Sequence, residues 1–330
     1  MTEGKKEIKR IGVFTSGGDA PGMNAAIRAV VRAANFYDLH VYGIHRGYEG
    51  MIDGEIKRLE TIDTANIIQR GGTILKTARS MRFMSPEGRK MAYDNLIEND
   101  IDALVAIGGN GTFTGAQVFL NEYGIPTIGL PGTIDNDLYG TDYTIGFDTA
   151  VNTAVQAVDK IRDTADSHNR LFLIEVMGRH SGYIALHTAI GSGASTFLIP
   201  EQATSIDGLV DKIKKALKRK KLFGLVIIAE GNHIGETMDI SKMLEERTTD
   251  YDVKVTIIGH LQRGGSPSAY DRMLASRLGH QAVVALMEGK YNVMAGVVND
   301  QVVFTDFEQA IKNKKEPTQD LIKMAEILGM

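Results

Sequence analysis

Short apolar runs alternate with longer amphipathic segments along the whole chain. The apolar runs have the length of buried β-strands and lie at residues 11–15, 41–45, 103–107, 127–130, 171–176, 196–199, 225–229 and 253–258. The segments between them repeat apolar residues at helical spacing, most clearly at residues 25–36, 149–162, 206–217 and 270–286. Strands that alternate with helices predict parallel βαβ units with right-handed crossovers. We therefore expect an α/β protein with room for two sheets.

The length and composition are those of a water-soluble globular protein. The chain has 330 residues, of which 43% are hydrophobic and 24% are charged, so it is long enough for two domains. The absence of cysteine excludes disulfides, zinc–thiolate centres and cysteine nucleophiles. No apolar run approaches the roughly 20 residues that span a bilayer, and the charged segment 1–10 lacks the apolar region of a signal peptide. These features predict a cytoplasmic protein without a membrane partner.

The charge and the aromatic content argue against a nucleic-acid partner. The formal net charge is −4, tryptophan is absent and aromatic residues make up 7% of the chain. A basic surface is the electrostatic footprint of nucleic-acid binding, and stacked aromatic rings are the platform for single strands. We therefore expect no binding to nucleic acid.

Glycine clusters follow strands or precede helices in the first half of the chain. Segment 16–24 (Ser-Gly-Gly-Asp-Ala-Pro-Gly-Met-Asn) joins a strand to a helix, segment 71–73 leads towards Lys76 and Arg79, and segment 108–112 ends a strand. Glycines let the backbone approach a ligand closely, and a helix N-terminus offers free N–H groups to phosphate. One such loop is equally typical of a tight βα connection, but three favour a polyphosphate site. Because neither the P-loop nor the dinucleotide fingerprint is present, the pattern favours phosphoryl transfer over redox chemistry.

Arginines stand next to strand ends in the second half of the chain. Arg170 precedes the strand expected at 171–176, Arg179 follows that strand, and Arg263 follows a later one. Guanidinium groups bind phosphate in a bidentate manner. One of these arginines alone is typical of a solvated surface, whereas three favour a site for a substrate phosphate. Glu230, at another strand end, is either a ligand of sugar hydroxyls or a simple loop acid, and its position does not decide between the two.

The segment Pro-Gly-Thr-Ile-Asp-Asn-Asp at 131–137 places two carboxylates after an apolar strand. Open α/β sheets bind ligands outside the carboxyl ends of their strands. One carboxylate, of Asp135 or Asp137, could accept a proton from a hydroxyl nucleophile while the other helps to hold a metal. Taken alone, the segment fits an Asp/Asn-rich surface turn equally well.

Together these motifs resemble the bacterial ATP-dependent 6-phosphofructokinases (the phosphofructokinase type A family), from about Lys9 to Glu308. The most specific elements are Thr-Ser-Gly-Gly-Asp-Ala-Pro-Gly-Met-Asn, Pro-Gly-Thr-Ile-Asp-Asn-Asp, Met-Gly-Arg and Gln-Arg-Gly-Gly-Ser-Pro. The resemblance implies two three-layer αβα domains with mainly parallel sheets and an active site in the cleft between them. The ATP-binding domain would comprise residues 1–146 plus about 262–308, and the sugar-phosphate-binding domain about 147–261 plus 309–330.

The resemblance implies transfer of the ATP γ-phosphate to the 1-hydroxyl of fructose 6-phosphate with Mg²⁺, giving fructose 1,6-bisphosphate and ADP, the committed step of glycolysis. Asp135 would accept the hydroxyl proton, and Arg179 would stabilise the transferring phosphoryl group. Thr133 and Asp137 would help to hold the sugar and the metal-bound phosphates, and Asn110 and Asp137 would contribute to the Mg²⁺ site. The ATP-binding residues would be Gly17, Tyr48, Arg79, Gly109, Asn110, Gly111 and Thr112. The sugar-phosphate residues would be Thr133, Ile134, Asp135, Met177, Gly178, Arg179, Glu230, His260 and Arg263, with Arg170 and Lys254 serving a neighbouring subunit of a homotetramer.

Several positions depart from the family pattern or bear on the phosphoryl donor. Asn110 stands where the family normally has Asp, which leads us to expect weaker metal binding or slower turnover because hard cations favour carboxylate oxygens. Lys254 replaces a usual arginine, and a point charge in place of a bidentate fork leads us to expect a raised KM for fructose 6-phosphate. Relatives that use pyrophosphate typically carry Asp at the position of Gly111 and Lys at that of Gly132, so the glycines here favour ATP.

Bacterial relatives bind an effector, ADP or phosphoenolpyruvate, between subunits. The residues that fit this site are Arg28, Arg32, Arg162, Arg219 and Lys221. Glu55 stands where a basic residue is usual, and Ser195 stands where a Glu is usual. Because a carboxylate that faces a phosphate is repulsive, we expect altered or weak allosteric control. Two other functions stay open from the sequence: a catalytically weakened regulatory paralogue, and a pyrophosphate-dependent phosphofructokinase.

Overall fold

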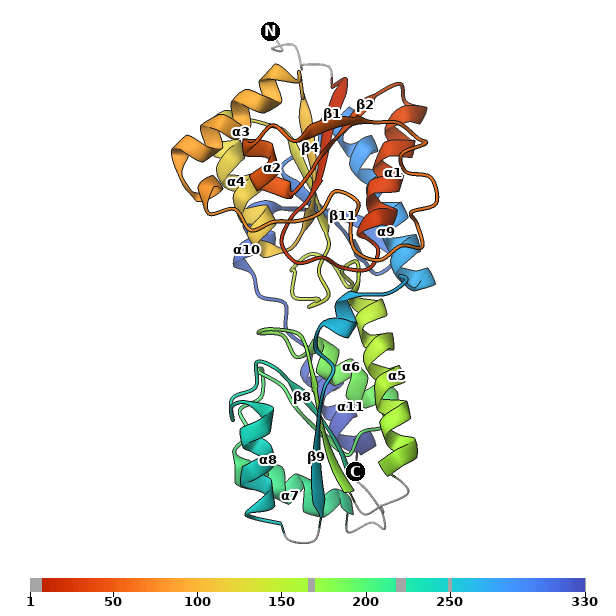
Figure 1. The fold of residues 1–330 in the computed structure, drawn as a ribbon, viewed down its shortest axis with the longest axis vertical. Coiled ribbons are helices and arrows are strands. Elements are labelled where there is room, and N and C mark those ends of the chain that lie inside the picture. The colour runs from red at the N-terminus through yellow and green to blue at the C-terminus, as the bar shows by residue number, and fades with distance from the viewer. Residues whose placement is uncertain (1–7, 166–169, 218–223, 249–250, 330) are drawn as a thin grey trace. The chain divides into compact units, whose positions relative to one another are not determined.

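The structure is a computed structural model that describes residues 8–165, 170–217, 224–248 and 251–329. The chain forms two compact units. The first contains Met1–Thr133, Leu138–Asp148 and Arg263–Lys314. The second contains Ile134–Asp137, Thr149–Gln262 and Lys315–Met330. Each unit is a twisted sheet with helices on both faces (Figure 1).

The sheet of the first unit has seven strands in the order β11-β10-β5-β4-β1-β2-β3. Its parallel centre consists of β1 (Arg10–Thr15), β2 (His40–Ile44), β4 (Ala103–Gly108), β5 (Thr127–Pro131) and β10 (Val293–Val298). The edge strands β3 (Ile56–Leu59) and β11 (Gln301–Asp306) run antiparallel to their neighbours. Every residue of β4 and β5 is buried, which explains why these strands read as continuous apolar runs in the sequence.

Helices cover both faces of this sheet. Figure 1 shows α1 (Met23–Phe36) and α9 (Ala269–Met287) side by side on one face. The other face carries α2 (Gly47–Ile52), the 3₁₀ helix η1 (Arg82–Met84), α3 (Pro86–Glu98), α4 (Asn110–Tyr123) and α10 (Phe307–Lys312). The core under this second group is aromatic, with Phe14, Phe83 and Phe119 nearly or fully buried.

The second unit contains a four-stranded, fully parallel sheet in the order β7-β8-β6-β9. Its strands are β6 (Arg170–Val176), β7 (Thr196–Leu198), β8 (Gly224–Ala229) and β9 (Asp252–Ile257). One face carries α5 (Phe147–Ala165), α6 (Tyr183–Ser192) and α11 (Gln319–Gly329), and the other carries α7 (Ile206–Leu217) and α8 (Thr237–Glu245). Apolar residues of α7 and α8 pack with the strands in one core cluster.

The predicted fold class is confirmed, and each of the eight predicted strands is present. The mainly parallel pairing is confirmed as well. The sequence pattern did not predict β3, β10 or β11, and β3 and β11 pair antiparallel at the edges of the first sheet. The β10–β11 hairpin turns at Asn299 and Asp300, whose φ angles of 50° and 59° fit the tight turn that matches the twist of two strands. Within the described part of the chain, none of the helices combines the length and the apolar character that crossing a membrane requires.

Close helix packing in the first unit depends on Gly279. A Cβ at this position would lie 2.7 Å from Ala29 Cβ and 2.9 Å from the Ala26 carbonyl oxygen of α1. In an open helix Gly→Ala gains up to about 1 kcal/mol, but overpacking against backbone costs about 1–3 kcal/mol. We expect Gly279→Ala to lower the free energy of unfolding in urea by about 1–2 kcal/mol.

The matched control is Gly111→Ala on α4, where an added Cβ would meet no heavy atom within 4 Å. That variant should leave the free energy of unfolding unchanged or slightly raised. Equal stability of the two variants would contradict the packing argument.

Candidate functional site

The loop between β1 and α1 is fixed at its base against the neighbouring strand. Ser16 N donates to Ile107 O at 3.0 Å, and Ser16 O accepts from Thr112 Oγ1 at 3.2 Å. Gly17 and Gly22 have φ angles of 85° and 109°, a region that favours glycine. No side chain caps α1 at Gly22, so the helix N-terminus keeps the N–H groups that can bind an anion.

Asn24 connects the second glycine segment to α1. Its side chain is 1% exposed; Nδ2 donates to Arg70 O at 3.0 Å and Gly71 O at 3.2 Å, and Oδ1 accepts from Ile74 N at 2.8 Å. A Cβ at Gly71 would lie 2.3 Å from the Gly265 carbonyl oxygen. The glycine segments that begin near residues 16, 71 and 264 are therefore neighbours in the fold.

Arg263 packs on the first glycine loop. Its Nη1 donates to Asp19 O at 3.1 Å, and a Cβ at Gly18 would lie 2.6 Å from the same nitrogen. His260 lies in the same 3₁₀ helix, η2 (Gly259–Arg263), and is exposed. Arg263 thus places a guanidinium group beside the loop that the sequence associates with phosphate.

The third glycine segment forms the start of α4 and rests on Tyr48. Gly109 caps the helix without a side-chain hydrogen bond, and α4 begins at Asn110. Tyr48 donates its hydroxyl proton to Thr112 O at 2.7 Å, and its ring stacks on Phe83 with centroids 4.0 Å apart. Tyr48 is only 6% exposed, and burial raises the pKa of its hydroxyl. The residue therefore lies beneath the loop and supports it.

Ion pairs between α2 and the segment around residue 80 position Arg79. Glu49 of α2 accepts hydrogen bonds from Ser80 Oγ at 2.5 Å and Arg82 Nη1 at 2.7 Å. Arg82 Nη1 also binds Asp53 Oδ1 at 2.7 Å. The hydrogen bonds from Ser80 and Arg82 lower the pKa of Glu49. Because Ser80 directly follows Arg79, this network fixes the backbone from which the Arg79 side chain extends.

The carboxylate pair belongs to the second unit. The chain passes from the first unit at Thr133 to the second, which contains Asp135 and Asp137. Asp135 is 6% exposed, and its carbonyl oxygen accepts a hydrogen bond from Ser181 Oγ at 2.8 Å. Asn136 is 1% exposed and has a φ of 52°. This left-handed turn, buried rather than on the surface, argues against the simple surface turn that the sequence left open.

Cationic groups surround the second carboxylate. Burial raises the pKa of Asp137, while its own backbone hydrogen bond and the nearby charges of Arg179, Lys315 and His180 act in the opposite direction. Lys315 Nζ also donates to Asn136 Oδ1 at 2.9 Å and lies 5.0 Å from the centre of the Tyr183 ring. The sequence analysis missed Lys315 because it stands in no motif and is far from the carboxylates along the chain.

Arg179 and Glu230 are brought together by two strand ends. Arg179 N donates to Glu230 Oε1 at 2.7 Å. A Cβ at Gly231 would lie 1.8 Å from the Arg179 carbonyl oxygen, and Gly178 and Arg179 have φ angles of 144° and 51°. Met177 beside them is buried, whereas the Arg179 side chain is exposed. The tight turn therefore fixes the backbone and leaves the guanidinium group accessible to a ligand.

Arg170 and Lys254 lie in the N-terminal halves of β6 and β9, away from the strand end that Arg179 follows. Both bind Asp252, Arg170 through Nε at 3.4 Å and Lys254 through Nζ at 2.7 Å. Arg170 begins β6 and Arg179 follows its end, so with a rise of about 3.3 Å per residue the two are roughly 20 Å apart along the strand. The structure therefore does not group the three strand-end arginines of the sequence analysis at one place.

The residues expected at an effector site are partly within the described chain. Arg28 and Arg32 lie one turn apart on α1; burial and the charge of Arg32 lower the pKa of Arg28. Arg162 of α5 donates from Nη2 to the Ser192 carbonyl oxygen. Arg219 and Lys221 lie outside the described residues. Two neighbouring guanidinium groups favour an anionic ligand.

Within residues 8–165, 170–217, 224–248 and 251–329, no group of three or more His, Asp or Glu side chains is placed to hold a metal ion. Mg²⁺ in kinase sites is bound by substrate phosphates and only one or two carboxylates. The carboxylate of Asp137 in the second unit and the amide oxygen of Asn110 in the first are each a hard donor of the kind that Mg²⁺ prefers.

Comparisons with known proteins give one consistent result. The family model described as Phosphofructokinase matches residues 10–286. The ATP-dependent 6-phosphofructokinase 2 of Bacteroides thetaiotaomicron is 55% identical over 98% of this chain and 99% of its own length. The ATP-dependent 6-phosphofructokinase 1 of Thermus thermophilus is 52% identical over 98% of this chain and 100% of its own length. The crystal structure of Pichia pastoris phosphofructokinase in the T-state matches with a TM-score of 0.88 and 36% identity; the match covers 94% of this chain but only 36% of the much longer Pichia chain.

The network around Arg79 can be tested without any ligand. Glu49→Gln removes the charge that holds Ser80 and Arg82, so we expect the backbone amides of residues 79–83 to exchange with deuterium severalfold faster. Mass spectrometry after pepsin digestion measures this rate. Glu98→Gln, an exposed acid at the end of α3, should leave the exchange of residues 79–83 unchanged, and equal rates in both variants would rule out the positioning role of Glu49.

Proposed function

The chain belongs to the phosphofructokinase family, and we propose that it transfers the γ-phosphate of ATP to the 1-hydroxyl of fructose 6-phosphate. The products are fructose 1,6-bisphosphate and ADP. Relatives of nearly equal length, 52% and 55% identical, carry the name ATP-dependent 6-phosphofructokinase, which supports this assignment. The observation that carries the proposal is the nearly buried Asp135, held by Ser181 in the same unit as Arg179.

Asp135 is the general base of the proposed reaction. Its carboxylate accepts the proton of the sugar hydroxyl as the hydroxyl oxygen attacks the γ-phosphorus, and the bond between that phosphorus and the ADP oxygen breaks. Arg179 stabilises the charge that spreads over the transferring phosphoryl group. Asp137 helps to position the metal-bound phosphates. Thr133, whose carbonyl oxygen accepts a hydrogen bond from Thr144 Oγ1 at 2.6 Å, holds the sugar next to the base.

The loops of the first unit provide the proposed ATP site. Gly17 and the segment 109–112 allow the nucleotide phosphates to approach the backbone, and the N-terminus of α4 adds N–H donors and a positive dipole end. Arg79 contributes a positive charge from a segment fixed by Glu49. Tyr48 supports the start of α4 through its hydrogen bond to the Thr112 carbonyl oxygen. We propose this supporting role for Tyr48 in place of the direct ATP contact that the resemblance implies.

The sugar phosphate is bound mainly by groups of the second unit. Glu230 accepts hydrogen bonds from sugar hydroxyls in this proposal, and Ile134, Met177 and Gly178 contribute to the same substrate site. His260 and Arg263 contribute to binding of the 6-phosphate. Arg170 and Lys254, which lie at the other end of the sheet from Arg179, serve the site of a neighbouring subunit, and this division supports a homotetramer as the active form.

Mg²⁺ carried by the nucleotide neutralises phosphate charge when it is bound. Asp137 and Asn110 would supply protein oxygens to it. Asn110 keeps an oxygen donor without a negative charge, so the chain contributes less to metal binding than a carboxylate at this position would.

ATP is the proposed donor rather than pyrophosphate. A Cβ at Gly111 would meet no heavy atom within 4 Å, so the space next to the start of α4 is open and has no carboxylate at this position to repel a nucleotide phosphate. A Cβ at Gly132 would lie 3.0 Å from Ile107 Cγ2 and 3.1 Å from Met23 Cε, and a lysine there would have to displace both. These two glycines support a site with room for the nucleotide.

An anionic effector is proposed at Arg28 and Arg32, with Arg162 and the residues Arg219 and Lys221 outside the described chain. The lowered pKa of Arg28 supports an anion-binding surface on α1. ADP and phosphoenolpyruvate are the candidate ligands, and the departures from the family pattern at Glu55 and Ser195 lead us to propose altered or weak control by them.

Replacement of Asp135 tests the base directly. We expect Asp135→Asn to lower kcat with ATP by about a thousandfold, within the 10²–10⁴ range of general base catalysis, with smaller changes in KM. A coupled assay that follows ADP formation measures this loss. Asp159→Asn, an exposed carboxylate on α5, should retain full activity.

An assay that follows fructose 1,6-bisphosphate, which forms from either phosphoryl donor, separates the alternatives when it is applied to the unaltered protein. Turnover with ATP and none with pyrophosphate supports the proposal, and the reverse identifies a pyrophosphate-dependent enzyme. Activity at background level with both donors would identify a regulatory paralogue.

Asn110→Asp restores a carboxylate next to the proposed nucleotide phosphates. We expect the Mg²⁺ concentration that gives half-maximal rate to fall by roughly threefold to tenfold, because hard cations prefer charged oxygen ligands. Initial rates across a Mg²⁺ series at fixed ATP measure the effect. Asn121→Asp, on the exposed side of the same helix, should leave the Mg²⁺ dependence as it is; an equal shift in both variants would point to general electrostatics instead.

A further inference from the structure

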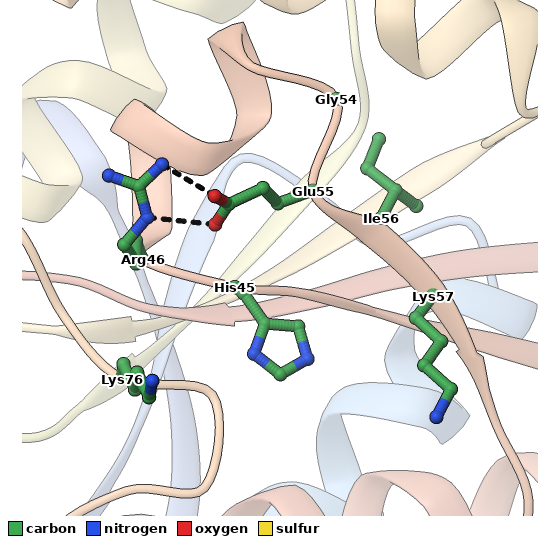
Figure 2. A pocket seen from close by; sticks show the side chains of 7 residues that line it. All are labelled: His45, Arg46, Gly54, Glu55, Ile56, Lys57 and Lys76. Carbon is green, nitrogen blue, oxygen red and sulfur yellow. Dashed lines mark hydrogen bonds and ion pairs between the residues drawn. The ribbon is translucent and has the colours of Figure 1, made fainter.

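A pocket of about 430 Å³ lies in the first unit, outside the residues assigned to either substrate. Figure 2 shows its lining, which comes from the end of β2, the start of β3 and the loop that precedes Arg79. The residues that form it include His45, Arg46, Glu55, Ile56, Lys57 and Lys76.

The only carboxylate in this lining is already neutralised. Arg46 binds both oxygens of Glu55, through Nε at 2.8 Å and Nη2 at 2.6 Å, and the dashed lines in Figure 2 mark these contacts. Hydrogen bonding to Arg46 lowers the pKa of Glu55, so the pair stays intact near neutral pH. Glu55 therefore leaves the remaining positive charge of the pocket uncompensated.

That charge comes from Lys57 and Lys76. Both side chains are exposed, and neither has a hydrogen bond or ion pair within the described chain. His45 lies between them in the view of Figure 2 and supplies a ring nitrogen. Like charges that gather at one pocket repel one another, which favours an anion as the ligand.

Backbone contacts fix the positions in the chain from which these cationic side chains extend. Lys57 pairs with Gly43 across β2 and β3. Lys76 has a φ of 56°, a left-handed backbone conformation that residues other than glycine seldom adopt. Its carbonyl oxygen accepts a hydrogen bond from Thr15 Oγ1 at 2.9 Å. Leu75 directly precedes Lys76, and its carbonyl oxygen accepts a hydrogen bond from Arg46 N at 2.8 Å. The loop and the strand ends are therefore joined, which fixes the backbone from which both lysine side chains extend.

We propose that this pocket binds the phosphate group of a small phosphate monoester. Lys57 and Lys76 are its charged ligands, His45 donates a further hydrogen bond, and Ile56 contacts the carbon skeleton of the ester. The volume exceeds that of inorganic phosphate alone, which favours an ester over the free ion. This site is separate from the proposed nucleotide and sugar-phosphate sites and does not depend on the proposed reaction.

Equilibrium dialysis of the full chain with radiolabelled glycerol 3-phosphate tests the proposal. Because the proposed nucleotide, sugar-phosphate and effector sites would also bind this probe, the comparison is between variants. Lys57→Ala/Lys76→Ala should bind one equivalent less per chain, or bind that equivalent at least about tenfold more weakly, since charge-assisted contacts to phosphate are the strong ones. Lys90→Ala/Lys290→Ala removes the same charge at exposed positions elsewhere and should bind as the unaltered chain does.

A crystal of the full chain soaked in glycerol 3-phosphate gives the location. Density for the phosphate bounded by Lys57 and Lys76, lost in the double variant, supports the proposal. Identical stoichiometry and affinity in both double variants would overturn it, as would a soaked crystal with the probe only at other sites. Binding of inorganic phosphate as tight as that of the ester would refute the contact with Ile56. Circular dichroism melting of each variant confirms that it is folded before binding is measured.

Discussion

Close approach of backbone segments at glycines is the constraint on which the first unit's loops depend. Segments 16–24, 70–74 and 108–112 meet where a Cβ would collide with a carbonyl oxygen or a neighbouring hydroxyl: at Gly108, for example, a Cβ would lie 2.2 Å from Thr112 Oγ1 and 2.6 Å from Ser16 O. Buried polar side chains such as Asn24 satisfy the backbone groups that this packing removes from water. The result is a rigid set of strand ends with free helix N-termini, which suits a ligand that carries several phosphates.

The second unit contains a partly buried carboxylate, that of Asp137, whose charge must be compensated. A carboxylate that is nearly buried is costly unless positive charge or hydrogen bonds compensate it. Asp137 is destabilised in its charged form by burial, and Arg179, Lys315 and His180 offset part of that cost. In the proposed reaction Arg179 also stabilises the transferring phosphoryl group, so a group that favours the charged form of Asp137 is also one that the chemistry needs.

Residues that touch no substrate in this proposal still determine where the site residues stand. Tyr48 and Glu49 are adjacent in the chain, yet they support different segments: Tyr48 holds the start of α4, and Glu49 holds the residues after Arg79. Arg46, at the start of the same helix, binds Glu55. The N-cap and first turn of the short helix α2 thus connect the nucleotide loops with the cationic pocket, through the side chains of Arg46, Tyr48 and Glu49.

The α/β class, eight of the strands and the motifs at strand ends could be predicted from the sequence, because periodicity and glycine placement are local properties. The sequence also identified the family through motifs spread along the chain. Only the tertiary structure decided the antiparallel edges, the burial of Tyr48, the separation of Arg170 from Arg179 and the approach of Lys315 to Asn136. These features arise from contacts between residues far apart in the chain, up to 179 positions in the case of Lys315 and Asn136. Such contacts cannot be predicted from a local sequence pattern, because their energy comes from packing and charge in the folded state rather than from the preferences of neighbouring residues.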